Sequence, residues 1–327
     1  MKLERYKNNP ILKPDDFKDS DIGAVFNCGV TATKTGEIVM LFRIAPSGYT
    51  KDPSGNGYTN YVSSIGSAVS KDGYSFSVDE KAVITPREEW DRYGCEDPRI
   101  TRFADKDKET FLVTYTALSS PAFSGKGDRV ALATTEDFKN FNRHGVIIPG
   151  LNDKDAVFFP ERINGRIALI HRIPPDIQIV YFDDMEEVVK PDGNFWSQYS
   201  ESIEDHTILK REYAWEAKKI GAGPPPVKTK EGWLLVYHGV DKDHVYRTGV
   251  ALLDLEDPVK VIARSPLPIL EPEEDYEKYG DVNNVVFAEG AIVLDNTLFV
   301  YYGAADKVCA LATVKVDDIL DFLKGFR

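Results

Sequence analysis

The residues best suited to chemistry are Glu96-Asp97-Pro98-Arg99, where two carboxylates, a proline and an arginine precede a strand-like run. Because proline disfavours the helical region for the residue before it, we expect Asp97 to be extended, at a sheet end, with its side chain facing a cleft. Arg99 is close enough in sequence to hold a neighbouring carboxylate ionised or in one rotamer. The motif is therefore either a catalytic carboxylate site or a strand-entry turn with a local ion pair.

The elements that would position this motif recur along the chain. Five apolar and aromatic runs of strand length cover residues 38–43, 110–116, 166–172, 233–239 and 297–303. A second run of small and apolar residues returns at 65–76 and 130–141, with weaker copies at 248–254 and 308–314. Five repeats of strand, hairpin and strand predict an all-β fold, a five-bladed β-propeller with a central active-site cleft. A β-sandwich with similar strand spacing is the alternative.

Helical signals are scarce. Acidic residues open the amphipathic stretch Asp317–Lys324, which predicts a short C-terminal helix. No linker divides the chain, so we expect one catalytic domain over residues 1–327. Residues 47–60, rich in Gly, Ser and Tyr, are expected to form a mobile loop at the rim.

In a propeller, the innermost strand of each blade lines a central channel, and its polar residues converge there. Equivalent positions of the five runs carry Arg43, Arg172, His238 and Tyr302. Basic residues at equivalent positions of an acidic protein indicate a shared purpose. Each of them alone could equally cap a strand or pair with a nearby carboxylate.

Composition narrows the classes of partner. The 327 residues carry a net charge of −13, which argues against nucleic acid and anionic membranes but not against a small anion. Three widely spaced cysteines, no signal-peptide core and no apolar run of membrane-spanning length indicate a cytoplasmic protein. Phosphate-loop and metal-binding motifs are missing, so we expect neither a metal nor a cofactor.

A series of short motifs resembles glycoside hydrolase family 130, the phosphorylases and hydrolases that act on β-mannosides. The resemblance covers nearly the whole chain, and each motif is weak alone but specific in this order. The motifs are Phe26-Asn27-Cys28-Gly29, Leu41-Phe42-Arg43, Glu96-Asp97-Pro98-Arg99, residues 154–161 (KDAVFFPE), residues 219–226 (KIGAGPPP), Tyr237-His238-Gly239 and residues 302–306 (YGAAD).

The resemblance implies a five-bladed propeller and the cleavage of a terminal β-mannosyl bond by inorganic phosphate, with inversion, to give α-mannose 1-phosphate. It makes Asp97 the general acid, acting through the 3-hydroxyl of mannose. An inverting hydrolase needs a second carboxylate to activate water. Phosphate is already an anionic nucleophile, so a cationic cradle takes the place of that base.

The resemblance also assigns ligands. The phosphate-binding candidates are Arg43, Lys154, Arg172, Lys218, Lys219 and His238. Related phosphorylases can have Arg-Asn at the position of Lys154-Asp155, and an ionised Asp155 would repel phosphate, so Asp155 is in doubt as a ligand. The substrate-binding candidates are Asn27, Glu96, Arg99, Tyr237, Tyr302 and Asp306, with Trp215 as a further aromatic that could stack on sugar.

Two other functions stay open. A hydrolase on the same fold would use Glu161, Asp281 or Glu289 as its base, and a sugar-binding propeller would have no turnover. We expect β-1,4-mannooligosaccharides as substrates, although β-1,2 linkages and other leaving sugars occur in the family. A homo-oligomer is also left open.

Overall fold

The computed structural model describes residues 1–18, 21–53, 57–105 and 108–327. In this part of the chain, five antiparallel sheets form the blades of a β-propeller. From the innermost strand outward, the first three blades are β2 (Ile22–Ala32), β3 (Ile38–Pro46), β6 (Ser64–Ser70) and β7 (Ser77–Val78); β8 (Gly94–Asp105), β9 (Lys108–Leu118), β10 (Asp128–Thr135) and β11 (Asn142–Val146); β12 (Lys154–Phe158), β13 (Ile167–Arg172), β14 (Ile177–Phe182) and β15 (Thr207–Leu209).

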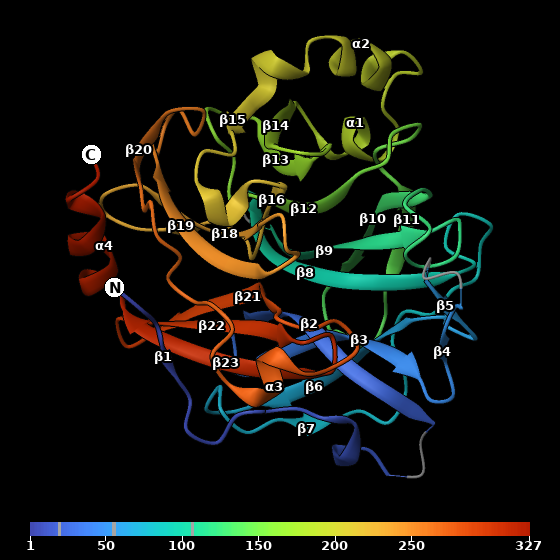
Figure 1. Ribbon diagram of the computed structural model, residues 1–327. Coiled ribbons are helices and arrows are strands. Elements are labelled where there is room, and N and C mark those ends of the chain that lie inside the picture. Colours follow the sequence, from blue (N-terminus) through green and yellow to red (C-terminus); the bar gives the residue numbers. More distant parts are fainter. Residues whose placement is uncertain (19–20, 54–56, 106–107) are drawn as a thin grey trace.

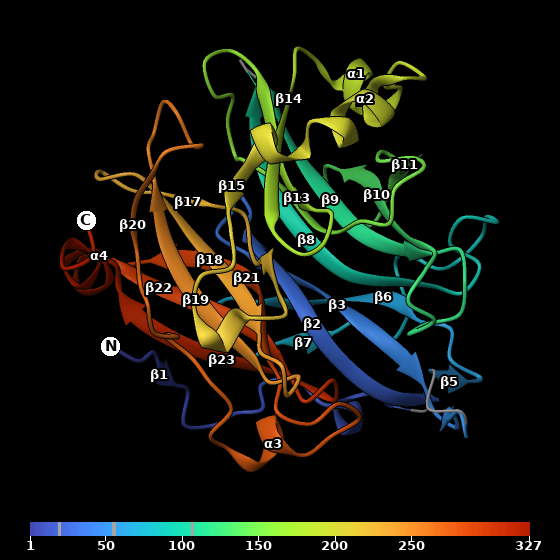
Figure 2. The ribbon, with the colours of Figure 1, turned by 45° about the horizontal axis from the view of Figure 1, so that its top comes forward.

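The last two blades complete the ring. They are β16 (Lys219–Ala222), β18 (Trp233–Val240), β19 (Tyr246–Leu253) and β20 (Val261–Arg264), with β17 (Val227–Lys228) beside β18; and β21 (Val286–Leu294), β22 (Thr297–Ala304), β23 (Val308–Lys315) and β1 (Glu4–Arg5). Figure 2 shows the blades following the chain around the ring, from blue through green to red. The propeller prediction is confirmed, and the sandwich alternative is wrong.

The two ends of the chain meet in the last blade. β1 pairs antiparallel with β23, with Glu4 opposite Thr313 and Arg5 opposite Ala312. Both ends therefore lie on the same side of the molecule in Figure 1. β1 thus forms the outermost strand of the last blade, and the other three strands of that blade are β21, β22 and β23.

The apolar runs of the sequence were expected to form the innermost strands, and this expectation is wrong. They form β3, β9, β13, β18 and β22, each the second strand of its blade. A second strand is covered on both faces by neighbouring blades, so it is the most continuously apolar; β18, for example, is buried throughout. The second set of runs lies in the third strands β6, β10, β19 and β23.

Helices decorate this ring. They are α1 (Met185–Val189) and α2 (Phe195–Glu201) in the third blade, α3 (Asp275–Lys278) before the last blade, α4 (Val316–Lys324) at the C-terminus, and the short 3₁₀ turns η1 (Pro14–Asp16), η2 (Ile203–His206) and η3 (Ala214–Glu216). α4 confirms the predicted C-terminal helix. Among the described residues, no helix is long and apolar enough to cross a membrane.

The predicted rim loop contains a small ladder between β4 (Thr50–Lys51) and β5 (Tyr58–Thr59). Residues 54–56 of this loop lie outside the described part of the chain.

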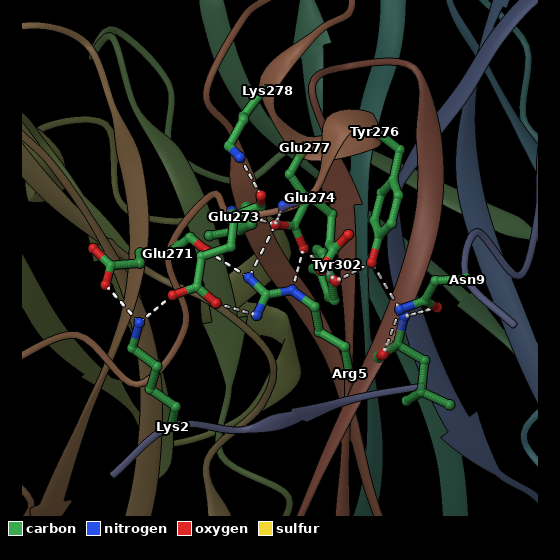
Figure 3. A network of polar contacts seen from close by, with 12 residues as sticks. Lys2, Arg5, Asn9, Glu271, Glu273, Glu274, Tyr276, Glu277, Lys278 and Tyr302 are labelled. Atoms are coloured by element: carbon green, nitrogen blue, oxygen red, sulfur yellow. Dashed lines mark hydrogen bonds and ion pairs between the residues drawn. The ribbon is translucent and has the colours of Figure 1, made fainter. Parts of the chain in front are cut away.

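A polar network secures the closing strand (Figure 3). Arg5 Nε donates to Glu277 Oε1 at 2.8 Å and Arg5 Nη2 to Glu277 Oε2 at 2.9 Å. The Glu277 side chain is fully buried, and its Oε2 also accepts from the backbone amides of Glu273 and Glu274. A buried carboxylate without a cation is costly. The contact of Arg5 in β1 with Glu277 in α3 should therefore matter more for the free energy of unfolding than a surface ion pair would.

We therefore expect Arg5→Ala to lower the free energy of unfolding by about 3 kcal/mol, since it leaves the Glu277 carboxylate buried without its cation. Denaturant unfolding measures this change. The control is Arg166→Ala, which removes the exposed pair with Asp183 and should cost less than about 1 kcal/mol. Equal losses in the two variants would contradict a special role for Arg5 in closure.

Candidate active site

A cavity of about 240 Å³ opens on the ring centre. In an antiparallel blade, the N-terminal end of the innermost strand lies beside the C-terminal end of the second strand. Residues from these ends therefore converge. All five blades contribute to the lining, which includes Asn27, Arg43, Asp97, Lys154, Asp155, Arg172, Lys219, His238, Tyr246, Phe287 and Asp306.

A larger hollow, of about 990 Å³, lies between the first two blades, near Val39 and Phe111. Its walls carry none of the residues predicted to act in catalysis or binding. We therefore place the candidate active site in the smaller central cavity, where acidic and basic side chains converge.

Three of the central side chains are presented by β-bulges. The strand register shifts at Asn27 in β2, at Asp97-Pro98 in β8 and at Asp155-Ala156 in β12. The three polar residues have φ values of 52°, 54° and 57°, the left-handed conformation that Asn and Asp tolerate best. A bulge bends its strand and re-aims a side chain, so the same backbone device serves three blades.

The expectation of an extended Asp97 is therefore wrong. Pro98 disfavours only the right-handed helical region for its neighbour, and the bulge takes the left-handed one instead. β8 also begins before the motif, at Gly94, rather than after it.

Asp97 is 5% exposed and is held by side chains from two strands of the first blade, β2 and β3. Asn27 Nδ2 donates to Asp97 Oδ1 at 2.8 Å, and Arg43 Nη1 lies 3.3 Å from the same oxygen. Gly303 lies against Asn27: a Cβ there would come within 1.9 Å of Asn27 Oδ1. The position of the carboxylate thus depends on residues of three blades.

Glu96 and Arg43 form a buried pair beneath Asp97. Arg43 Nη2 contacts Glu96 Oε1, and Ser63 Oγ donates to this oxygen at 3.0 Å. Burial raises the pKa of Glu96, while the Arg43 charge opposes the rise. Glu96 is 2% exposed and does not line the cavity, so its contact with the cavity runs through Arg43.

Basic side chains from the second, third and fourth blades gather around Asp155. Its Oδ2 lies 3.1 Å from Arg172 Nη2 and 3.4 Å from His238 Nε2, and its Oδ1 accepts from Arg99 Nη2 at 2.9 Å. Burial opposes ionisation, but Arg172, His238 and Arg99 outweigh it and hold the pKa of Asp155 well below its usual range. Asp155 is therefore an ionised carboxylate that organises cations.

Two of these basic side chains keep hydrogen-bonding capacity. Among the described residues, Arg172 Nε and Nη1 and His238 Nδ1 are buried without a hydrogen-bond partner. The two Arg172 nitrogens are donors, and because buried donors without partners are costly, an anion in the cavity would satisfy them. Lys154, which lies 3.3 Å from Asp128, adds charge, and the nearby carboxylates, Asp128 first, raise its pKa against the effect of burial.

Two groups have pKa values close to neutrality. Burial, assisted by the Arg172 charge, lowers the pKa of Lys219 to about 7, and its ammonium lies 5.4 Å from the centre of the Tyr246 ring. Burial raises the pKa of Asp306 to about 7, while Arg43 opposes the rise. Burial also lowers the pKa of His238 well below its usual value. At neutral pH, His238 is therefore neutral, whereas Lys219 and Asp306 are half-ionised.

Besides Glu96, four other predicted residues lie outside the cavity lining. Tyr237 is fully buried and contacts Arg264 and Glu216, because the second strand packs there against η3. Tyr302 donates to Glu277 at 2.8 Å, in the closure network of Figure 3. Lys218 is exposed and contacts His244, and Arg99 lies beneath the cavity, 2.9 Å from Glu289. The aromatic Trp215 packs on Tyr237 in the same interior layer.

Sequence reasoning missed the aromatic residues that two blade strands contribute to the cavity, and the role of Asp155. Tyr246 and Phe287 line the cavity from β19 and β21, and both pack against the His238 ring. The innermost strands of three blades each have an Asn or Asp at the bulge, namely Asn27, Asp97 and Asp155. This recurrence is a signal in the sequence that could have revealed the bulges. Among the described residues, no group of His, Cys, Asp and Glu could hold a metal ion.

Comparison with known proteins places this propeller among the mannoside phosphorylases. A family model described as β-1,4-mannooligosaccharide phosphorylase matches residues 2–325. The chain belongs to that family, glycoside hydrolase family 130.

The names of the relatives state different mannosidic linkages. The chain is 38% identical to a 1,2-β-oligomannan phosphorylase of Thermoanaerobacter sp. (strain X514), across 98% of this chain and 99% of the relative. It is 30% identical to a β-1,4-mannooligosaccharide phosphorylase of Ruminococcus albus, across 98% and 90%. The solved β-1,2-mannobiose phosphorylase of Listeria innocua, in complex with β-1,2-mannobiose, has a TM-score of 0.83 and 32% identity, covering 99% of this chain and 100% of that one.

The contact between Gly221 and Asp155 gives a test of the cation cluster. A Cβ at Gly221 would meet Asp155 Oδ2 at 2.3 Å and His238 Cε1 at 2.5 Å, so both flexible side chains must shift. We expect Gly221→Ala to weaken phosphate binding about tenfold and to lower the melting temperature by a few degrees, since both side chains are buried and small displacements in such sites have large effects. Calorimetric titration with inorganic phosphate measures the affinity.

Gly193→Ala is the matched control, because a Cβ there meets nothing within 4 Å and should leave phosphate affinity unchanged. Wild-type affinity in Gly221→Ala would show that the positions of Asp155 and His238 do not matter for the anion.

Proposed function

We propose that this protein cleaves a terminal β-mannosidic bond with inorganic phosphate and inverts the configuration at the anomeric carbon, giving α-mannose 1-phosphate. The observation that carries the proposal is the pair of unpartnered buried donors of Arg172 in the cavity that also holds Asp97. One wall offers a proton source and the other an anion site, as an inverting phosphorolysis requires.

In this mechanism, Arg172, Lys219, Lys154 and His238 hold phosphate below the anomeric carbon, and Arg43 spans both halves of the site. A phosphate oxygen forms the new bond to the anomeric carbon as the bond to the glycosidic oxygen breaks. The leaving oxygen takes a proton supplied by Asp97 through the mannose 3-hydroxyl. Asn27 and Asp306 bind sugar hydroxyls. No metal or organic cofactor takes part, and phosphate is a co-substrate.

Asp155 has a supporting role in this proposal. Its negative charge would repel phosphate if it faced the anion alone. Its Oδ1 instead accepts from Arg99, and its Oδ2 lies 3.1 Å from Arg172 and 3.4 Å from His238, so the carboxylate helps to position these three side chains. Arg99, buried beneath the cavity, acts through Asp155 rather than on the substrate.

A hydrolase on this fold would need a carboxylate that activates water opposite the acid. Of the three possible bases, Glu161 is half-buried and pairs with Lys228, and Glu289 is buried against Arg99. Asp281 accepts from the Tyr49 hydroxyl and lies 3.6 Å from Lys307. None of the three lines the central cavity as described, which favours phosphate over water as the nucleophile.

For the linkage, we propose β-1,2-mannosides in place of the β-1,4 preference expected above. The support is the greater identity to a relative named for β-1,2 linkages, 38% against 30% for the one named for β-1,4 linkages.

Product analysis tests the proposal. β-1,2- and β-1,4-mannobiose are each incubated with and without inorganic phosphate. We expect α-mannose 1-phosphate only with phosphate, faster from the β-1,2 substrate, and at least a hundredfold slower in Asp97→Asn because that variant lacks the acid. Asp183→Asn, which changes an exposed carboxylate, is the control.

Each other outcome identifies a competing function. Free mannose released equally well without phosphate would indicate the hydrolase. No turnover, with sugar binding intact in Asp97→Asn, would indicate a binding protein. Faster cleavage of the β-1,4 substrate would overturn the linkage proposal alone.

The pKa of Lys219 predicts a pH dependence. Because that pKa is lowered to about 7, Lys219 is a cation below this pH and neutral above it. We expect the KM for phosphate to rise as the pH increases from 6 to 8.5 in the wild type. Lys219→Arg keeps its charge throughout this range, so its profile should be flatter.

Phosphate and Asp306 titrate in both proteins, so the difference between the two profiles reports Lys219. Parallel profiles would mean that Lys219 does not titrate beside the phosphate.

A further inference from the structure

Phe123 lies at the mouth of the central cavity and is unusual in two respects. It belongs to the connection between β9 and β10, lines the cavity and is 49% exposed. Its φ is 63°, a left-handed conformation that is rare for a bulky residue. A large apolar side chain kept exposed in a strained backbone points to a ligand that covers it.

A wall of tyrosines supports this ring from the first blade. The Phe123 ring centre lies 5.2 Å from that of Tyr58 and 6.3 Å from that of Tyr61, and Tyr49 packs edge-on against both tyrosines. The Tyr58 hydroxyl donates to the carbonyl of Asp281 at 2.9 Å, and the Tyr49 hydroxyl to its carboxylate. The connection before the last blade thus anchors the wall.

Turn contacts also fix the backbone of Phe123. Ser124 N donates to the Pro121 carbonyl at 3.2 Å, and Ser119 N donates to the Gly127 carbonyl at 3.0 Å. Gly57, after β4, lies so close that a Cβ there would meet the Ala122 carbonyl at 2.5 Å. The phenyl ring is therefore held in place before any ligand arrives.

The wall lies on the acid side of the cavity. The Arg43 guanidinium lies 5.4 Å from the Tyr61 ring centre and 3.3 Å, through Nη1, from Asp97. Arg172 and His238 instead surround Asp155 on the third and fourth blades. In an inverting displacement, the nucleophile and the leaving group occupy opposite faces of the anomeric carbon. The leaving sugar must then lie on the side of the anomeric carbon away from Arg172 and His238, and the aromatic wall stands on that side.

We propose that Phe123, supported by Tyr58 and Tyr61, is the stacking platform for the pyranose ring that leaves, and so a determinant of which sugar is accepted there. This inference rests on the proposed phosphorolysis. An apolar face of the pyranose covers the exposed phenyl ring of Phe123. Because the phenyl ring is fixed, it determines the angle at which that sugar meets the bound mannose.

The reverse reaction tests this platform, because it separates the two sugars. The enzyme is given α-mannose 1-phosphate as donor and mannose or β-1,2-mannobiose as acceptor, and phosphate release is measured. Phe123→Asn removes the ring but suits the left-handed backbone, so the variant should fold normally. We expect its KM for the acceptor to rise about tenfold while the KM for α-mannose 1-phosphate stays within twofold.

Phe123→Trp keeps a flat aromatic surface and should retain most of the acceptor affinity. Phe326→Ala, which removes an exposed phenyl ring at the C-terminus, should change neither constant. An unchanged acceptor KM in Phe123→Asn, or an equal rise in both constants, would overturn the platform. A wild-type protein that makes no product in either direction would instead refute the phosphorolysis on which the platform rests.

Discussion

Charges removed from water need partners, and this constraint shapes the centre of the propeller. Arg99 is 1% exposed and binds the carboxylates of Asp155 and Glu289 together with the carbonyl of Gly223. Four blades therefore meet at one guanidinium. Because Arg99 already satisfies one oxygen of Asp155, the other is left for Arg172 and His238.

The same constraint explains the polarity of the cavity. Arg43 binds Glu96 and Asp97 on one side, so its charge is largely satisfied within the protein. Arg172 has a single carboxylate partner and two nitrogens without one. The remaining positive potential is therefore concentrated at the third and fourth blades. Removing the central carboxylates would change where this potential lies, even though they do not touch the substrate.

The sequence predicted the number of blades because the most apolar strands are the second ones, which neighbouring blades cover on both faces. The innermost strands gave a weak pattern, since β8 and β12 carry polar residues and bulges where they line the cavity. Arg43, Arg172 and His238 were found on the second strands because their C-terminal ends reach the same cavity. Tyr302 occupies the equivalent position, but its hydroxyl turns to Glu277, a contact that spacing alone does not encode.

The closing strand has a consequence for the order in which the protein is made. The last blade takes β1 from the start of the chain and β21 to β23 from its end, so no earlier segment can complete the ring. During synthesis, β1 has no partner strand until β23 has been added, so the edge of β1 stays unpaired while the four earlier blades are made. Asp306 and Phe287 belong to the same late blade. A nascent chain that lacks this blade therefore holds four blades and an incomplete cavity, because the side chains that the last blade adds to the centre are made after all the others.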